Sequence, residues 1–226
     1  MPLRIYASRT LSASNLVVLL LGGASFGMWF FLSLYLQQVR GYSPLRAGFA
    51  FLPMTLCIVA GSTLASRAVT RIGAKPLLVV GMVIEAVGLL WFTDLAPHGT
   101  YVGEVLVPSL LCAIGIGLAF VPATIAAVAG VSREESGLAS GLVNTSRLVG
   151  GALGLAILAA IAAARTNTDL HHHAAGVHAA LTSGFVIAFA VAAAFAAVGA
   201  VIAVLGLPTI RPRAAEARRR LAAEGA

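Results

Sequence analysis

Long apolar stretches alternate with short polar connectors along nearly the whole chain. Each stretch has at least 20 residues, and about 20 residues in a helix suffice to cross the hydrocarbon core of a bilayer. The pattern predicts an all-α, polytopic membrane protein with six transmembrane helices, at residues 15–39, 45–68, 76–95, 104–129, 136–164 and 181–207. Residues 1–14 and the basic tail 208–226 are expected to lie outside the membrane. Six spans divide into three plus three, a division that would fit nested inverted repeats.

The composition supports the same fold class. The chain is 59% hydrophobic and 10% charged, whereas soluble domains are about 45–50% apolar and about 25% charged. We therefore expect the lipid bilayer to surround the protein as its partner. Cys57 and Cys112 both lie inside apolar stretches, where they are typical of small buried side chains, so we expect no disulfide, no metal and no cofactor.

The distribution of basic residues predicts the orientation. Eleven lysines and arginines lie in the two terminal segments and in the connectors before residues 76 and 136, against three on the opposite side, namely Arg40, Arg46 and Arg165. The positive-inside rule then places both termini in the cytoplasm of a cell with this protein in its plasma membrane. The net charge of +7 follows from these cytoplasmic connectors, and we expect no nucleic acid partner.

The fifth apolar stretch differs from the others in its glycines and polar residues. Four glycines recur along one face of the expected helix, at Gly137, Gly141, Gly150 and Gly154. Each glycine costs a helix interior about 1 kcal/mol relative to alanine, but small residues allow membrane helices to pack backbone to backbone. We therefore expect a helix-packing face here, which begins after a capping box at residues 132–135.

Three polar side chains inside the spans are candidates for a substrate or proton pathway. Asn144 and Arg147 lie on the fifth stretch, and Glu85 lies near the middle of the third. Ionisable side chains cost about 2.5–3.5 kcal/mol at the centre of a spanning helix, so they usually face a cavity or a partner. Arg147 is either a cavity-lining cation or a packing residue that reaches toward the cytoplasm, and Glu85 is either a proton or cation site or a protonated structural residue.

Two polar segments outside the spans have competing interpretations. Arg67, Arg71 and Lys75 around Gly73 form either a cytoplasmic gating loop or a plain topology signal that contacts anionic lipid. The histidines 171–173 lie in an expected polar loop over residues 165–178. Three adjacent histidines do not share one helical face, so a solvated loop is favoured over a metal site.

The first apolar stretch contains a G-x-S-x-G sequence at residues 23–27. That sequence forms a nucleophile elbow only at a strand–turn–helix junction, and here it lies inside a membrane span. We expect Gly23 and Gly27 to serve helix packing instead, and the protein not to be an enzyme. Trp29 and Tyr35, further along the same stretch, are typical of an aromatic belt at the membrane interface.

Three phrases of the sequence resemble a known transporter family. Residues 70–75, Thr-Arg-Ile-Gly-Ala-Lys, resemble the cytoplasmic loop motif of the major facilitator superfamily, with Thr70 at its acidic position. Residues 41–48 and 137–147 resemble the C-terminal half of drug:proton antiporters of the EmrB/QacA type, which have fourteen spans. The resemblance implies the last six spans of a proton-coupled exporter of small amphipathic compounds.

The same resemblance implies that a partner is needed to complete the transporter. One half of a major facilitator cannot rock around a midplane site by itself, so we expect a missing N-terminal half or a second copy as partner. The alternative is a non-transporting membrane protein, or a scaffold that packs with another membrane protein.

Overall fold

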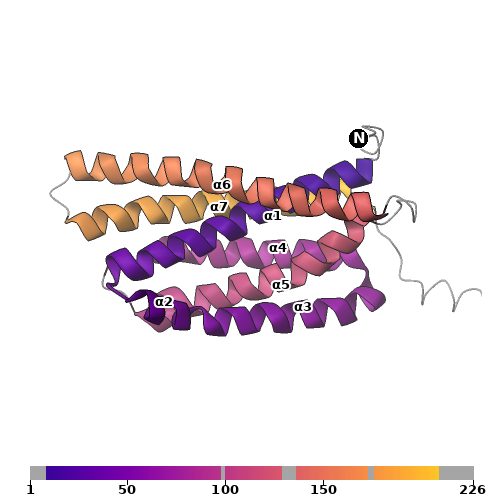
Figure 1. Ribbon diagram of the computed structural model, residues 1–226, viewed down its shortest axis with the longest axis horizontal. Helices are drawn as coiled ribbons and strands as arrows, with labels where there is room; N and C mark the ends of the chain where they lie inside the picture. The colour runs from indigo at the N-terminus through magenta and orange to yellow at the C-terminus, as the bar shows by residue number, and fades with distance from the viewer. Residues whose placement is uncertain (1–8, 98–99, 129–135, 173–175, 209–226) are drawn as a thin grey trace, which may run out of the picture.

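The described part of the chain is built from helices alone. The computed structural model describes residues 9–97, 100–128, 136–172 and 176–208, and no strand occurs among them. The main helices, shown in Figure 1, are α1 (Arg9–Leu34), α2 (Pro44–Ala50), α3 (Leu52–Ile72), α4 (Ala74–Trp91), α5 (Val107–Val128), α6 (Ser136–His172) and α7 (Val177–Gly206). Three short elements complete them: η2 (Tyr35–Val39), η3 (Phe92–Asp94) and η4 (Tyr101–Leu106).

Within the described residues, six helical segments are long and apolar enough to cross a membrane. They cover Leu11–Val39, Pro44–Ile72, Ala74–Asp94, Tyr101–Ala126, Gly137–His171 and Val177–Gly206. Helices satisfy all of their backbone hydrogen bonds internally, which is what a lipid environment demands. The predicted all-α fold with six spans is therefore confirmed.

Local sequence signals set several helix boundaries. The Ser43 hydroxyl accepts the backbone N–H of Arg46 at 3.3 Å, and Pro44 occupies the first helical position of α2. The second span is divided at Phe51 into α2 and α3 because Pro53 follows, which lacks an N–H and crowds the preceding turn. Gly73 joins α3 to α4 at a φ of +88°, which favours glycine.

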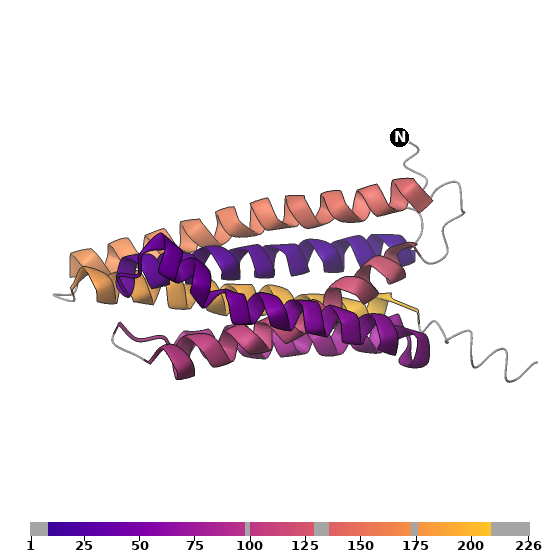
Figure 2. The same cartoon turned by 60° about the horizontal axis from the view of Figure 1, so that its bottom comes forward.

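The first half of the sequence contains α1 to α4, and the second half contains α5 to α7. The first helix of each half packs against helices of the other half, as Figures 1 and 2 show. Helix α1 packs against α6 and α7 of the second half, and α5 packs against α3 and α4 of the first. Helices α4 and α7 also lie against each other. Because each half covers the other's first helix, the three-plus-three division forms one bundle rather than two separate units.

Glycines bring the backbones of α1 and α6 together. A Cβ atom at Gly150 would meet the backbone of Leu19, and one at Gly154 would meet the backbone of Gly23. These two glycines therefore lie where the backbones of α6 and α1 approach each other. Gly137 and Gly141 differ, because apart from the nearby backbone of their own helix no heavy atom of the described residues lies within 4 Å of their Cβ positions. Their predicted packing role has no partner within the described part of this chain.

The end of α6 corrects one expectation. Residues 165–172 are helical rather than part of a polar loop. Arg165 Nε lies 3.4 Å from Asp169 Oδ2, one turn further along the helix, and the Ser183 hydroxyl of α7 donates to the same oxygen. This pairing stabilises two additional helical turns. The expected capping box at residues 132–135, His173, residues 1–8 and the tail from 209 onward lie outside the described residues.

One pair of matched substitutions tests the packing face. We expect Gly150→Ala to lower the thermal stability of the detergent-solubilised protein, because its Cβ would meet the Leu19 backbone and overpacking costs about 1–3 kcal/mol. Gly48→Ala, at an exposed position of α2 with no neighbouring atom near its Cβ position among the described residues, should be neutral or slightly stabilising. Equal melting temperatures for the two variants would contradict the assignment of the α1–α6 contact.

Candidate functional site

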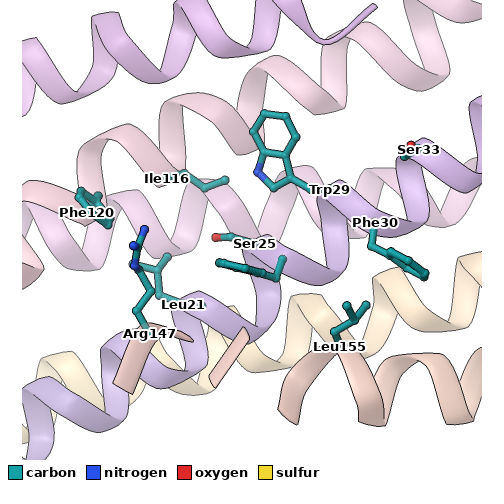
Figure 3. A pocket seen from close by; sticks show the side chains of 11 residues that line it. Leu21, Ser25, Trp29, Phe30, Ser33, Ile116, Phe120, Arg147 and Leu155 are labelled. Atoms are coloured by element: carbon teal, nitrogen blue, oxygen red, sulfur yellow. The ribbon is translucent and has the colours of Figure 1, made fainter. Parts of the chain in front are cut away.

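A cavity of about 580 Å³ opens between α1, α5 and α6. Figure 3 shows the side chains that line it, which are Leu21, Ser25, Phe26, Trp29, Phe30, Ser33, Ile116, Phe120, Arg147 and Leu155, together with Gly22. We call this cavity the groove. Its walls are mainly aromatic and aliphatic, with two serine hydroxyls and one arginine as polar groups. A pocket of this size with a few placed polar groups suits a drug-sized ligand.

Arg147 is the charged group of the groove. Its Nη2 donates to Asn144 Oδ1 at 3.0 Å, and its guanidinium carbon lies 5.2 Å from the centre of the Phe120 ring. A smaller cavity of about 200 Å³ beside the groove is lined by both Asn144 and Arg147. The structure thus brings together two of the three residues that the sequence singles out inside the spans.

Glu85 lies behind the groove wall rather than in it. Its side chain is fully buried on α4, and its Oε1 accepts the Ser25 hydroxyl proton at 2.8 Å. The second carboxyl oxygen, Oε2, has no hydrogen-bond partner among the described residues. Because Ser25 also lines the groove, a single hydroxyl separates the buried carboxyl from the space where a ligand would lie.

Glu85 and Arg147 do not form an ion pair. Within the described part of the chain the salt bridge found is the one between Arg165 and Asp169. Glu85 instead bonds to Ser25, and Arg147 bonds to Asn144. The charge on Arg147 is therefore not neutralised by an acidic side chain that the structure describes.

Two residues that line the groove, Trp29 and Ser25, are not among the predicted site residues. Trp29, which the sequence places in an interfacial belt, lines the groove and stacks on Phe51 with ring centres 5.2 Å apart. Ser25 belongs to the G-x-S-x-G sequence, yet it lies in a continuous helix and its partner is Glu85. A pairing across 60 positions in the sequence leaves no local signal, so only the folded chain reveals it.

The predicted gating loop is divided between exposed and anchored residues. Arg67 and Arg71 are exposed at the end of α3, and Gly73 forms the turn. Lys75 instead donates from Nζ to the backbone carbonyl of Leu207 at 2.7 Å. That bond places the start of α4 beside the end of α7 and satisfies a carbonyl at a helix C-terminus.

The predicted histidine loop begins inside helix α6. His171 is exposed at the end of α6. Among the described residues, no group of three or more His, Cys, Asp or Glu side chains is arranged to hold a metal ion.

Comparison with known proteins identifies relatives over most of the chain. Residues 14–224 match the Major Facilitator Superfamily. The puromycin resistance protein of Streptomyces alboniger is 37% identical over 199 residues, which are 87% of this chain and 39% of that protein. The cephamycin export protein of Amycolatopsis lactamdurans is 36% identical over 167 residues, which are 74% of this chain and 34% of that protein.

A third relative extends the same pattern. The tetracenomycin C resistance and export protein of Streptomyces glaucescens is 32% identical over 165 residues, which are 73% of this chain and 30% of that protein. The chain therefore spans between 30% and 39% of the length of these three relatives. Together with six apolar helices, the matches show an integral membrane protein and confirm the expectation that it is not an enzyme.

The hydrogen bond from Lys75 to Leu207 leads to a prediction about the end of α7. We expect Lys75→Met to speed amide hydrogen exchange in the last turn of α7 by about ten-fold, since a hydrogen bond to a charged group is worth about 1.5–3 kcal/mol. Mass spectrometry of peptides that cover residues 203–207 measures the rate. Arg71→Met, an exposed residue of the same loop, is the matched control and should leave the rate unchanged. Unaltered protection in Lys75→Met would argue against the anchor.

Proposed function

Because this chain belongs to the major facilitator superfamily, we propose that it is the C-terminal half of an exporter of amphipathic compounds. The observation that carries the proposal is the groove on α1, α5 and α6, about 580 Å³ in volume, with an aromatic and aliphatic wall and few polar groups. Burial of a ligand's apolar surface against such walls contributes affinity and does not depend on one ligand shape. This property suits a carrier of varied hydrophobic substrates. Relatives named for antibiotic export or resistance support the same activity.

Arg147 and Asn144 are the polar contacts that we assign to the substrate. An arginine that lacks an acidic partner can bind an acceptor group, such as a carbonyl, phenolate or carboxylate, with charge-assisted hydrogen bonds. Asn144 fixes the position of the guanidinium through its 3.0 Å hydrogen bond. Phe120 covers one face of the same group, so Arg147 is held in place before a ligand binds.

Glu85 is the residue that we assign to proton coupling. A carboxyl that is fully buried, with Ser25 as its side-chain partner, is far more stable neutral than ionised when nothing compensates the charge. Intramembrane acids of this kind mark proton pathways in transporters. In the proposed antiport cycle, Glu85 carries a proton inward and releases it to the cytoplasm when the substrate binds for export.

The remaining assignments concern the complete transporter. We propose as partner either the N-terminal half of a fourteen-span antiporter of the EmrB/QacA type or a second copy of this chain, with both termini of this half in the cytoplasm of the plasma membrane. Gly137 and Gly141, exposed on α6 with no neighbour among the described residues, would pack against that partner. Arg67 and Arg71, exposed at the end of α3, together with the Gly73 turn and Lys75 would form the cytoplasmic gate.

Export assays with an arginine variant test the substrate site. We expect Arg147→Gln in the native protein to weaken binding of an acceptor-bearing substrate by about ten- to a hundred-fold, which is the loss of one hydrogen bond to a charged group. Puromycin efflux from cells that express the protein is the first measurement. Arg46→Gln is the matched control, because Arg46 is exposed on α2 and contacts Tyr42. Equal efflux by both variants would remove Arg147 from the site.

A second variant tests proton coupling. We expect Glu85→Gln to bind substrate but to lose transport driven by a pH gradient in inverted membrane vesicles, because the amide cannot carry the proton. Glu104→Gln is the control, since Glu104 Oε2 accepts the N–H of Ala96 in a loop outside the groove. Uptake by Glu85→Gln that still follows the imposed pH gradient would exclude Glu85 as the proton carrier.

A further inference from the structure

The backbone of Glu85 lies directly against helix α5. A Cβ atom at Gly115 of α5 would lie 2.9 Å from Glu85 Cα, so α4 and α5 are in direct backbone contact there. The Cys112 thiol, on the same face of α5, lies 3.8 Å from the Glu85 backbone carbonyl and donates to it. No space remains between α4 and α5 at this level for a ligand or a chain of water molecules.

The helices around Glu85 contribute few other ionisable groups. Between Arg9 and Tyr35, α1 carries none, and α5 carries only the Cys112 thiol, which is bonded to the backbone. Helix α7 carries none between His178, near its start, and Gly206. On the groove side the charged group is Arg147 of α6. Within the described residues, the Ser25 hydroxyl is therefore the polar connection between the Glu85 carboxyl and the groove.

The direction of the Ser25–Glu85 hydrogen bond depends on the protonation state of Glu85. An ionised carboxylate only accepts hydrogen bonds, so Ser25 must donate to it, and the lone pairs of the hydroxyl oxygen then face the groove. A protonated carboxyl can donate to Ser25 Oγ, and the hydroxyl proton is then free to turn toward the groove. The groove thus presents an acceptor when Glu85 is ionised and a donor when Glu85 is protonated.

We propose that Ser25 is a substrate-binding residue that couples binding to proton release from Glu85. A substrate that carries a hydroxyl, phenol or amine donor binds to the acceptor form of Ser25, and thereby favours the ionised carboxylate. The class of ligand recognised at this position is an amphipathic hydrogen-bond donor. This inference rests on the proposed function, which assigns the exchangeable proton to Glu85.

The proton transfer balances without any further reactant. The Glu85 proton passes to Ser25 Oγ as the Ser25 hydroxyl proton passes to a water molecule in the groove, which carries it to bulk solvent. The hydroxyl is regenerated, the carboxyl becomes a carboxylate, and Ser25 then donates to Oε1, the carboxylate oxygen that lies 2.8 Å away. The substrate donor takes the place of the water at Ser25 Oγ.

A matched pair of ligands and three variants of the native protein test this inference. The ligands are 4-octylphenol, which has a donor, and its methyl ether 4-octylanisole, which does not. In wild type we expect 4-octylphenol to bind about ten-fold more tightly, as one hydrogen bond implies. It should also release protons into weakly buffered detergent solution, measured with a pH indicator over a series of pH values, whereas the ether should release none.

The variants separate this inference from the proposed function. Ser25→Ala should bind both ligands equally and release no proton, while Ser25→Thr, which keeps the hydroxyl, should behave as wild type. Glu85→Gln gives the baseline without release. Proton release by Ser25→Ala equal to wild type, or no preference of wild type for the phenol, would overturn the role of Ser25 and leave Glu85 as carrier. Release that persists in Glu85→Gln would instead overturn the proposed proton site.

Discussion

The close approach of helix backbones at glycines determines the shape of this bundle. Gly150 and Gly154 let α6 lie directly against α1, and Gly115 lets α5 lie directly against α4. Lipid offers no hydrophobic drive for helices to associate, so van der Waals contact of this kind is a main source of their attraction. Since α6 lies directly against α1, the groove forms between this helix pair and α5. The site therefore follows from packing and not from a dedicated loop.

The same close packing of helices in an apolar interior explains how the few polar side chains are arranged. In an apolar interior each polar side chain needs a partner, and the partners lie on different helices: Ser25 with Glu85 joins α1 to α4, and Ser146 with Asn15 joins α6 to α1 at 2.9 Å. Arg147 finds its partner within its own helix, at Asn144. Its charge stays available to a ligand. Among the described residues, the Ser25 hydroxyl is the polar group that connects the Glu85 carboxyl to the groove.

Much of the fold could be predicted from the sequence, because the length and apolarity of each span are local properties. The Ser43–Pro44 helix start and the Gly73 turn are local as well. The end of α6 was predicted wrongly, since the polar residues Arg165 and Asp169 suggest a loop but form an ion pair along one helical face. The site was predicted only in part: Asn144 and Arg147 meet because they lie three residues apart on a helix, whereas Ser25 and Glu85 meet through tertiary packing that no local pattern records.

The most direct test of the account is to locate a bound substrate along the helices. The native protein in membranes would be irradiated with a photoactivatable aryl-azide amphiphile, and the labelled peptides identified by mass spectrometry. The account predicts labels on the groove residues of α1, α5 and α6, such as Trp29, Ile116 and Leu155. Labels confined to the aliphatic cavity of about 360 Å³ between α4 and α7, at residues such as Val83 and Val201, would contradict it.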